Sequence, residues 1–423
     1  MKSELPPEIS SAKGERFEHH SMASDLKSTP VSKRIAIIDI WRGFALLGVV
    51  VVNFCSRNEE FLTSAMSKSL VSVGLDWRVK VVVDLLMANK FHTLFSFLFG
   101  VGFAIIIERA ARGAFDPKRV LLRRMLILLA IGWLHFLGLF SGEEIHVYAL
   151  CGLILLVCHR LTNGTILTVG ILLAFFPRLM LEEWPFFQRA FSLPPLPPPV
   201  WFADLGSADV KFRLLHSDDS ASYVALNFGI AMHNLSSWST SGAYFLYFLG
   251  RVLIGFVAWR AGWLRNFLMI PTDRLAKCVI FTGIASALIT SAAFTDCLGE
   301  RGSLGHVAYN AIRQAGFFVV VAFYVSILTW LHRIGWLGRL LMPLALLGRM
   351  SLTAYLTQSV FLMVLLAGPG LALAGRIGAS TAALLALAVY VAQLFASGAW
   401  SRHFGHGPVE WIWRRLTYTG LRD

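Results

Sequence analysis

The sequence predicts an all-α polytopic membrane protein, a bundle of about ten transmembrane helices. Apolar residues make up 56% of the 423-residue chain and charged residues only 15%, and the mean hydropathy is +0.63. Apolar runs of roughly 15 to 20 residues recur along most of the chain, and no soluble domain has enough interior to bury them all. The composition therefore excludes a disordered protein and an ordinary soluble enzyme.

The N-terminal half begins with a polar tail. Residues 1–33 mix charges with Ser and Pro and lack apolar periodicity, which predicts a disordered cytoplasmic tail. Residues 34–181 form a predicted five-helix membrane half, and 70–89, with four charged residues in an apolar stripe, is predicted to be an amphipathic interfacial helix. The predicted spans of this half are 35–54, 91–107, 122–141, 147–161 and 165–181.

The C-terminal half follows a long connection. Residues 182–241 contain the run SLPPLPPPV and several acidic residues, which is typical of an extracytoplasmic loop or cap. Residues 242–400 form the second predicted five-helix half, with 336–348 interfacial, and 401–423 is a basic interfacial segment. In that segment Glu410 and Arg414 are spaced for an i,i+4 ion pair. The predicted spans here are 242–259, 277–294, 313–331, 350–367 and 378–397.

The distribution of basic residues predicts the orientation. With the N-terminus inside, the inner segments hold more than twice as many Lys and Arg as the outer ones, so both termini are expected in the cytoplasm. Orientation and attraction to anionic lipid account for the formal charge of +13, and nucleic-acid binding is not expected. The five cysteines form no cluster with metal-ligand spacing, so no metal is expected. Cys55 and Cys297 could both face the outside, and their pairing stays open.

Ionisable groups inside apolar runs are the first candidates for function, because burying them in a membrane is costly. In the first predicted helix, Asp39 and Arg42 are spaced for an ion pair. Arg42 and Asn53 are eleven residues apart, which places both on one helix face about 16 Å apart along the axis. The alternative is that the charged pair anchors the helix at the headgroups and Asn53 caps its end.

The third predicted helix carries His135 deep in an apolar stretch, followed by Glu143. A buried His with a nearby carboxylate is what a general base needs, since the carboxylate fixes the tautomer. Arg124 has the same eleven-residue offset from His135. The alternative is a His that only bonds a neighbouring helix. Further candidates to bind substrate are Lys90, Tyr148, Arg349 and Gln358, although polar residues around Gln358 are equally typical of helix packing.

Five strings carry a family resemblance. They are DIWRGFALLGVVVVN, KFHTLFSFLFGVGFAI, LLRRMLILLAIGWLHFL with GEEIHVYAL, GRMSLTAYLTQS and GPVEWIWRRLT. These strings resemble, in order, the signature blocks of the YeiB family of bacterial inner-membrane proteins, whose C-terminal half is a domain of unknown function. In its first helix that family is similar to transmembrane acyltransferases of the acyltransferase-3 and heparan-glucosaminide N-acetyltransferase types. The resemblance implies a multi-pass protein of the bacterial inner membrane.

The resemblance also implies a chemistry, with one departure. Acyltransferase-3 proteins have an Arg, ten residues and a catalytic His; here Arg42 matches the Arg, but Asn53 stands where the His belongs. Heparan-type enzymes have Asn there and supply a His from the next loop, yet residues 54–90 contain no His. A base from elsewhere is therefore expected, and His135 with Glu143 or Arg124 is the candidate. The family block that usually reads Gly-Asp-Ile-Leu here reads Gly142-Glu143-Glu144-Ile145.

The favoured hypothesis is a transmembrane acyltransferase that moves an acyl group from cytosolic acyl-CoA, its co-substrate, to a small-molecule or glycan acceptor outside. Arg42, Lys90 and Arg124 would attract the phosphates of CoA, and Asn53 would donate to the developing oxyanion. The alternative is a transporter or exporter of a small organic solute that uses Asp39, Arg42, His135 and Glu143 as a relay. A non-catalytic envelope protein is a third alternative. No cofactor is expected to stay bound, membrane lipid is an expected partner, and a homo-oligomer stays open.

Overall fold

The computed structural model describes residues 36–60, 74–110, 117–192, 194, 213–236, 238–294 and 303–419. Every regular element in these ranges is a helix, which confirms the predicted all-α class. The predicted tail 1–33, Cys297 and most of 193–212 in the predicted cap lie outside the described residues. Contacts divide the chain into Met1–Ala36 and Ile37–Asp423, and the second unit holds the whole helical bundle except the first residue of its first helix.

Seventeen helices follow one another in these ranges, joined by short turns or by segments outside the description. They are α1 (Ala36–Glu60), α3 (Leu75–Leu86), α4 (Lys90–Ala110), α5 (Pro117–Gly138), α6 (Ile145–Cys158), α7 (Asn163–Glu182), α8 (Trp184–Phe191), α10 (Ser220–Ser236), α11 (Trp238–Arg260), α12 (Trp263–Met269), α13 (Thr272–Phe294), α14 (Leu304–Arg333), α15 (Gly335–Leu340), α16 (Met342–Arg349), α17 (Ser351–Leu366), α18 (Ala379–Ser401) and α19 (Pro408–Tyr418).

The described part of the chain has fewer full-length membrane spans than the ten predicted from the sequence. In the described part of the chain, eight helices are long and apolar enough to cross a bilayer, and a ninth span exists if Gly335–Arg349 and Ser351–Leu366, bent by 81°, act together. The predicted span 147–161 corresponds to α6, which has only 14 residues and is about 21 Å long. The predicted interfacial segment 70–89 contains α3, which continues through a turn into α4 as one apolar stretch of 35 residues.

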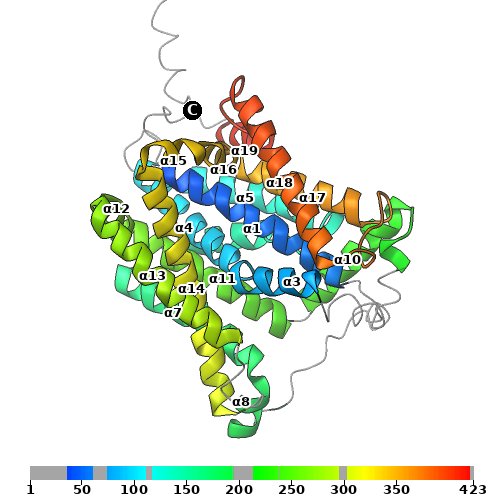
Figure 1. Cartoon of the computed structure of the whole chain (residues 1–423), viewed down its shortest axis with the longest axis horizontal. Coiled ribbons are helices and arrows are strands. Elements are labelled where there is room, and N and C mark those ends of the chain that lie inside the picture. The colour runs from blue at the N-terminus through cyan, green and yellow to red at the C-terminus, as the bar shows by residue number, and fades with distance from the viewer. Residues whose placement is uncertain are drawn as a thin grey trace, which may run out of the picture. The chain divides into compact units, whose positions relative to one another are not determined.

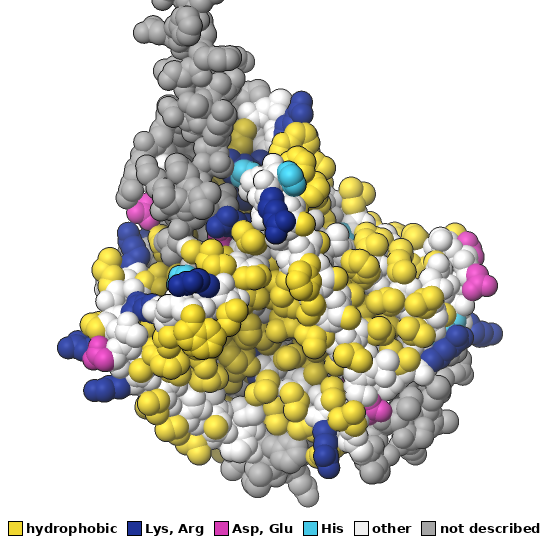
Figure 2. Space-filling model, turned by 45° about the horizontal axis from the view of Figure 1, so that its top comes forward, with side chains coloured by type: hydrophobic (Ala, Val, Ile, Leu, Met, Phe, Trp, Pro, Cys, Tyr) yellow, Lys and Arg dark blue, Asp and Glu magenta, His cyan; other side chains and the backbone are white. Residues whose placement is uncertain are grey.

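Apolar side chains on the outside of the bundle support its place in a membrane. On α13, Ile280, Ile284 and Leu288 are exposed at a spacing of four residues, so they form one stripe along the helix. On α18, Leu384 and Phe395 are likewise exposed. Figure 2 shows hydrophobic side chains over a broad area of one face, with charged side chains mainly toward its edges. Stripes of this kind would be exposed to water in a soluble protein, whereas lipid accommodates them. The chain is a multi-pass membrane protein.

The bundle has two ends, which we name by their helices. The end that carries α12, α15, α16 and α19 is the α19 face, and the end that carries α8 is the α8 face (Figure 1). Arginines at the α19 face close the ends of helices. Arg260 donates to the Leu161 carbonyl at 2.9 Å, and Arg333 donates to the Leu268 carbonyl at 2.6 Å. Carbonyls at helix ends lack partners within the helix, so these guanidinium groups satisfy them.

Helix α11 lies at the centre of the contacts because glycines allow close approach on two sides. A Cβ at Gly255 would lie 2.1 Å from the Phe97 carbonyl oxygen of α4, and one at Gly100 would lie 2.0 Å from the Val252 carbonyl oxygen. On the other side, a Cβ at Gly250 would lie 2.2 Å from the Ala174 nitrogen of α7. Small residues are how membrane helices gain close packing without a hydrophobic driving force between them. The central segment of α11 is therefore held tightly between α4 and α7.

The C-terminal helix α19 is fixed by Glu410. The predicted ion pair with Arg414 is wrong, since the Glu410 carboxylate accepts the Leu352 amide at 2.7 Å and the Thr353 amide at 3.1 Å. Those amides open α17 and have no partner within their own helix, so a carboxylate there also meets the positive end of the helix dipole. Burial raises the pKa of Glu410, and the hydrogen bonds from Thr353 and Leu352 oppose that rise.

Candidate functional site

A cavity of about 100 Å³ lies in the bundle, lined by residues of α1, α4, α5, α6, α17 and α19. Most of its lining is apolar or aromatic, and the residues that matter most here are Phe95, Phe99, Glu144, Tyr148, Tyr355 and Trp413. The lining, apolar with a few polar groups, is typical of small-molecule sites, but the volume is below the roughly 300 Å³ at which pockets for whole ligands begin, so the cavity has room for only part of a ligand. Tyr148, predicted to bind substrate, lies in this lining, whereas Asn53 does not.

The polar end of the cavity is built where α6 begins. Gly132 of α5 has no side chain, so the start of α6 approaches closely: a Cβ at Gly132 would lie 2.4 Å from the His146 nitrogen. Glu144 is the residue before the first turn of α6. Because α6 is short, its first turn begins inside the bundle, with Ile145 and His146 both buried. Because α6 has only 14 residues, it does not reach the α8 face, and the Glu144 carboxylate at its start lies inside the bundle.

Glu144 pairs with a histidine that the sequence analysis did not select. Its carboxylate oxygen lies 3.2 Å from Nδ1 of His92 on α4. The Tyr148 hydroxyl is 3.5 Å from the other Glu144 oxygen, and it lies 3.2 Å from the Ser96 hydroxyl. The side chains of His92 and Glu144 are 16% and 17% accessible, so space adjoins both. A His held through Nδ1 by a carboxylate can take a proton at its other ring nitrogen.

The predicted partnership of His135 with Glu143 is not what the structure shows. Glu143 lies 2.6 Å from Nδ1 of His146, three residues along the chain, and it also accepts the Ile145 amide. His135 packs its ring 5.6 Å from that of Tyr355, and both of its nitrogens are buried without a hydrogen-bond partner. Glu143 bonds His146 instead, because that side chain is only three residues along the chain and lies within reach.

The charges predicted at the end of the first helix do meet. Asp39 lies 3.3 Å from Arg42, which confirms the i,i+3 pair, and it lies 3.6 Å from Nε of Arg349 on α16. Glycines allow α1 and α16 to approach closely, since a Cβ at Gly348 of α16 would lie 1.9 Å from the Asp39 carbonyl oxygen of α1. Nearby at the α19 face, the Arg124 guanidinium stacks 3.7 Å from the ring of Trp413, which lines the cavity.

Lys90 does not belong to this group, so its predicted place beside Arg42 and Arg124 is wrong. Lys90 is the first residue of α4, and it is Gly102, twelve residues later, that lies next to the Arg42 guanidinium. Twelve residues of helix span about 18 Å, which puts Lys90 toward the α8 face. Gln358 is also away from the cavity. It bonds Gln393 of α18 at 2.9 Å, which is the packing alternative that the sequence left open.

Within the described ranges, His, Cys, Asp and Glu do not gather in groups of three or more that could hold a metal ion. The contacts described above give the candidate site three parts. These are the charged group Asp39, Arg42 and Arg349, the cavity behind Trp413, and the pair His92 and Glu144 at its polar end.

Comparison with known proteins assigns the family. The model of a family described as "Protein of unknown function (DUF418)" matches residues 258–420. An uncharacterized 39.9 kDa protein from the amylase 3' region of Bacillus acidopullulyticus is 31% identical over 388 residues, which are 92% of this chain and 95% of that protein. The uncharacterized protein YeiB of Escherichia coli (strain K12) is 25% identical over 405 residues, 91% of this chain and 96% of its own. This chain belongs to the YeiB family.

A third relative supports the same assignment along most of the chain. The uncharacterized protein YxaH of Bacillus subtilis (strain 168) is 26% identical over 417 residues, 93% of this chain and 97% of that protein. The matches therefore cover the half of this YeiB-family chain that holds His92 and Glu144 as well as the half that the family model matches.

One buried residue of this YeiB-family chain escaped the sequence analysis. Arg251 lies in the middle of α11 and is fully buried, and none of its three side-chain nitrogens has a hydrogen-bond partner in the part of the chain that the structure describes. Its guanidinium stacks 3.5 Å from the ring of Tyr247. The signal was present in the sequence, because an arginine at the centre of the apolar run 242–259 is the kind of intramembrane charge that marks a functional site.

Proposed function

We propose that this YeiB-family protein is a transmembrane acyltransferase that takes an acyl group from acyl-CoA and passes it to an acceptor reached from the other side. The observation that carries this proposal is the cavity, because it joins Trp413, covered by Arg124, to Glu144, paired with His92. In this arrangement the anionic CoA part of the thioester would lie at the cationic end, beside Arg124. Its uncharged acyl part would lie in the apolar cavity, near His92.

The proposed orientation places the α19 face in the cytoplasm of a bacterial inner membrane, with both chain termini on that side. The helix ends at this face carry Arg260, Arg265 and Arg333, and α19 adds Arg414 and Arg415. Short loops rich in Lys and Arg remain on the cytoplasmic side during insertion. Arg42 and Arg124 would then meet the phosphates of CoA where CoA is found.

The proposed chemistry is a single transfer. His92, held through Nδ1 by Glu144, accepts the proton of an acceptor hydroxyl or amine at its other ring nitrogen. The acceptor oxygen or nitrogen forms a bond to the thioester carbonyl carbon, the carbon–sulfur bond breaks, and the CoA thiolate leaves and takes the proton. The Tyr148 hydroxyl, which lines the cavity, replaces Asn53 as the proposed donor to the carbonyl oxygen. Acyl-CoA is a co-substrate and not a bound cofactor.

The test uses the full chain purified in detergent. Acetyl-CoA and longer acyl-CoAs are added, binding is followed by thermal shift, and released CoA is measured by mass spectrometry. We expect stabilisation that Arg42→Ala weakens and CoA release that His92→Ala and Glu144→Gln abolish. Arg265→Gln, which removes an ion-paired arginine at the same face, is the matched control. Absence of acyl-CoA binding to the folded protein would overturn the proposal.

A second candidate is a transporter or exporter of an organic anion. The buried and unpaired guanidinium of Arg251 favours it, because intramembrane charges of this kind line the paths of transported ions. Uptake of labelled organic anions into vesicles that contain the protein distinguishes the two, since the acyltransferase releases CoA and the transporter does not.

A further inference from the structure

Four cations follow one another through the half of the bundle near the α8 face, separated by two aromatic rings. Arg251 lies 3.5 Å and Arg178 5.1 Å from the centre of the Tyr247 ring. Arg178 also lies 5.8 Å from the centre of the Phe317 ring, Lys90 lies 5.1 Å from it, and the last cation, Arg313, lies 6.0 Å from it. The four cations, which we call the basic row, come from α11, α7, α4 and α14.

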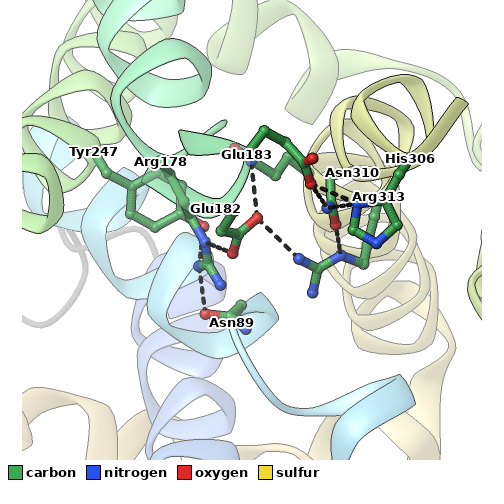
Figure 3. Close-up of polar contacts among 9 residues, drawn as sticks. Asn89, Arg178, Glu182, Glu183, Tyr247, His306, Asn310 and Arg313 are labelled. Carbon is green, nitrogen blue, oxygen red and sulfur yellow. Dashed lines mark hydrogen bonds and ion pairs between the residues drawn. The ribbon is translucent and has the colours of Figure 1, made fainter. Parts of the chain in front are cut away.

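The carboxylates near the basic row do not balance it. Figure 3 shows Glu182 between Arg178 and Arg313, at 2.8 and 3.0 Å. The neighbouring Glu183 is occupied by His306 at 2.7 Å and by Asn310. Among the described residues, the basic row therefore has one ion-paired carboxylate for four positive charges.

Lys90 and Arg251 form the buried part of the basic row. Lys90 donates to the Asp84 backbone carbonyl at 2.6 Å, while the Asp84 carboxylate lies 3.7 Å from Lys80. An ammonium has three donors, so two of those on Lys90 have no protein partner in the description. Arg251 has five donors, and none of its nitrogens has a partner. A buried guanidinium in this state is costly and cannot avoid the cost by losing its proton.

The packing prevents Arg251 from escaping to the surface. It follows Gly250, which packs against α7, and precedes Val252, whose carbonyl packs against Gly100 of α4. Its stacking on Tyr247 stabilises the charge but supplies no acceptor. Guanidinium and ammonium groups that outnumber their carboxylates offer donors that suit a carboxylate or a phosphate.

We propose that Lys90, Arg178 and Arg251 form a binding site for an anionic group, a carboxylate or a phosphate, that enters from the α8 face. Arg313 and Arg178 provide the entrance, since their side chains are 30% and 15% accessible, whereas Lys90 and Arg251 are buried. The site goes beyond the proposed acyl transfer and does not depend on it, because an anionic acceptor and a transported anion both have the required group.

The inner end of this site approaches the candidate catalytic pair. The Phe248 ring lies 6.3 Å from that of His92 and 6.2 Å from that of Tyr247, on which Arg251 stacks. A ligand whose anionic group reaches Arg251 therefore has the rest of its structure within reach of His92. The same chemistry can come from a soluble anion or from the headgroup of an anionic phospholipid, and the experiment separates these two sources.

The test uses the full chain in an uncharged detergent at constant ionic strength set with chloride. Inorganic phosphate and succinate are titrated while thermal stability is measured, and native mass spectrometry records retained phosphatidylglycerol. Wild type is compared with Lys90→Gln and Arg251→Gln, two separate variants in case one fails to fold. Arg265→Gln is the control, because Arg265 is ion-paired with Glu108 at 3.4 Å near the α19 face.

If the anion is soluble, the phosphate or succinate concentration for half-maximal stabilisation rises about tenfold or more in both variants and stays unchanged in the control, since each removes charge-assisted hydrogen bonds. If the anion is a lipid headgroup, wild type and the control retain phosphatidylglycerol and both variants lose it. If neither variant differs from the Arg265→Gln control with any of the three probes, the proposal is overturned.

Discussion

The charges at the α19 face and those of the basic row are made of the same residue types but are used differently. At the α19 face, Asp39 lies between Arg42 and Arg349, near the ends of α1 and α16. In the basic row, Arg251 has no hydrogen-bond partner among the described residues, and it is more deeply buried than any of those three. Paired charges at helix ends hold helices in register at little cost, whereas an unpaired charge in the interior persists when it serves a ligand. The comparison teaches that one residue type can share a carboxylate at the end of the bundle and lie without an acceptor among the described residues in its interior.

The largest expected effect tests whether His92 or His135 is the general base of the proposed acyl transfer. Because general bases contribute roughly a hundredfold or more to rate, His92→Ala should lower CoA release by at least about that factor. Glu144→Gln should act in the same direction, since it removes the carboxylate that fixes the tautomer of His92. Rates are measured by mass spectrometry at saturating acyl-CoA.

The matching variant is His135→Ala, which removes a histidine without a hydrogen-bond partner. It should leave the rate close to that of wild type, because no described carboxylate fixes the tautomer of His135, whereas Glu144 lies beside His92. A larger loss in His135→Ala than in His92→Ala would restore the assignment that the sequence favoured.

The next effect concerns the close packing of α11 against α4, which holds Arg251 in place. Gly255→Ala should lower the free energy of unfolding by about 1 to 3 kcal/mol, because its Cβ would lie 2.1 Å from the Phe97 carbonyl oxygen. Thermal unfolding in detergent measures the change. As a control, Gly398→Ala should be neutral or stabilising, since nothing lies within 4 Å of a Cβ there and alanine favours the helix. Equal responses of the two variants would show that α4 and α11 are not held as closely as described.

A third prediction compares two arginines of the same helix. Arg251→Met should raise the thermal stability of the ligand-free protein by about 1 kcal/mol or more, because it replaces an unsatisfied buried charge by a side chain of similar length. Arg260→Met should lower stability, because Arg260 donates to the Leu161 carbonyl at 2.9 Å and to Asn163 at 2.5 Å. A loss of stability in Arg251→Met as large as that in Arg260→Met would mean that Arg251 is structural.

The smallest expected effect lies at α19. Glu410→Gln should lower stability by about 1 kcal/mol, because it weakens the acceptor for the Leu352 and Thr353 amides at the start of α17. Arg414→Gln should change stability by less than about 0.5 kcal/mol, as is typical of surface substitutions away from such features. If Arg414→Gln costs as much as Glu410→Gln, the ion pair predicted from the spacing exists after all.

Local spacing predicted one contact within a helix, Asp39 with Arg42, but failed for Glu410 and Arg414 within α19 and for contacts between helices. Asp39 and Arg42 meet as predicted because three residues of helix bring their side chains together. His135 and Glu143 do not meet, since the chain leaves the helix at Gly138 and Glu143 finds His146 instead. The pair His92 and Glu144 joins residues 52 positions apart on different helices, and no periodicity within either helix specifies such a contact.

The sequence alone determined that this protein is a multi-pass helical membrane protein of the YeiB family. Hydropathy and helix periodicity are properties of single segments, and the bilayer imposes helices on any apolar segment that crosses it. Only the tertiary structure decided which polar residues are partners. Glycine contacts set how closely α11 approaches α4 and α7, and this packing buries Arg251. A separate glycine, Gly132 of α5, lets the start of α6 approach, and Glu144, just before that start, lies beside His92. Those distances depend on surfaces of several helices at once, so no single stretch of sequence contains them.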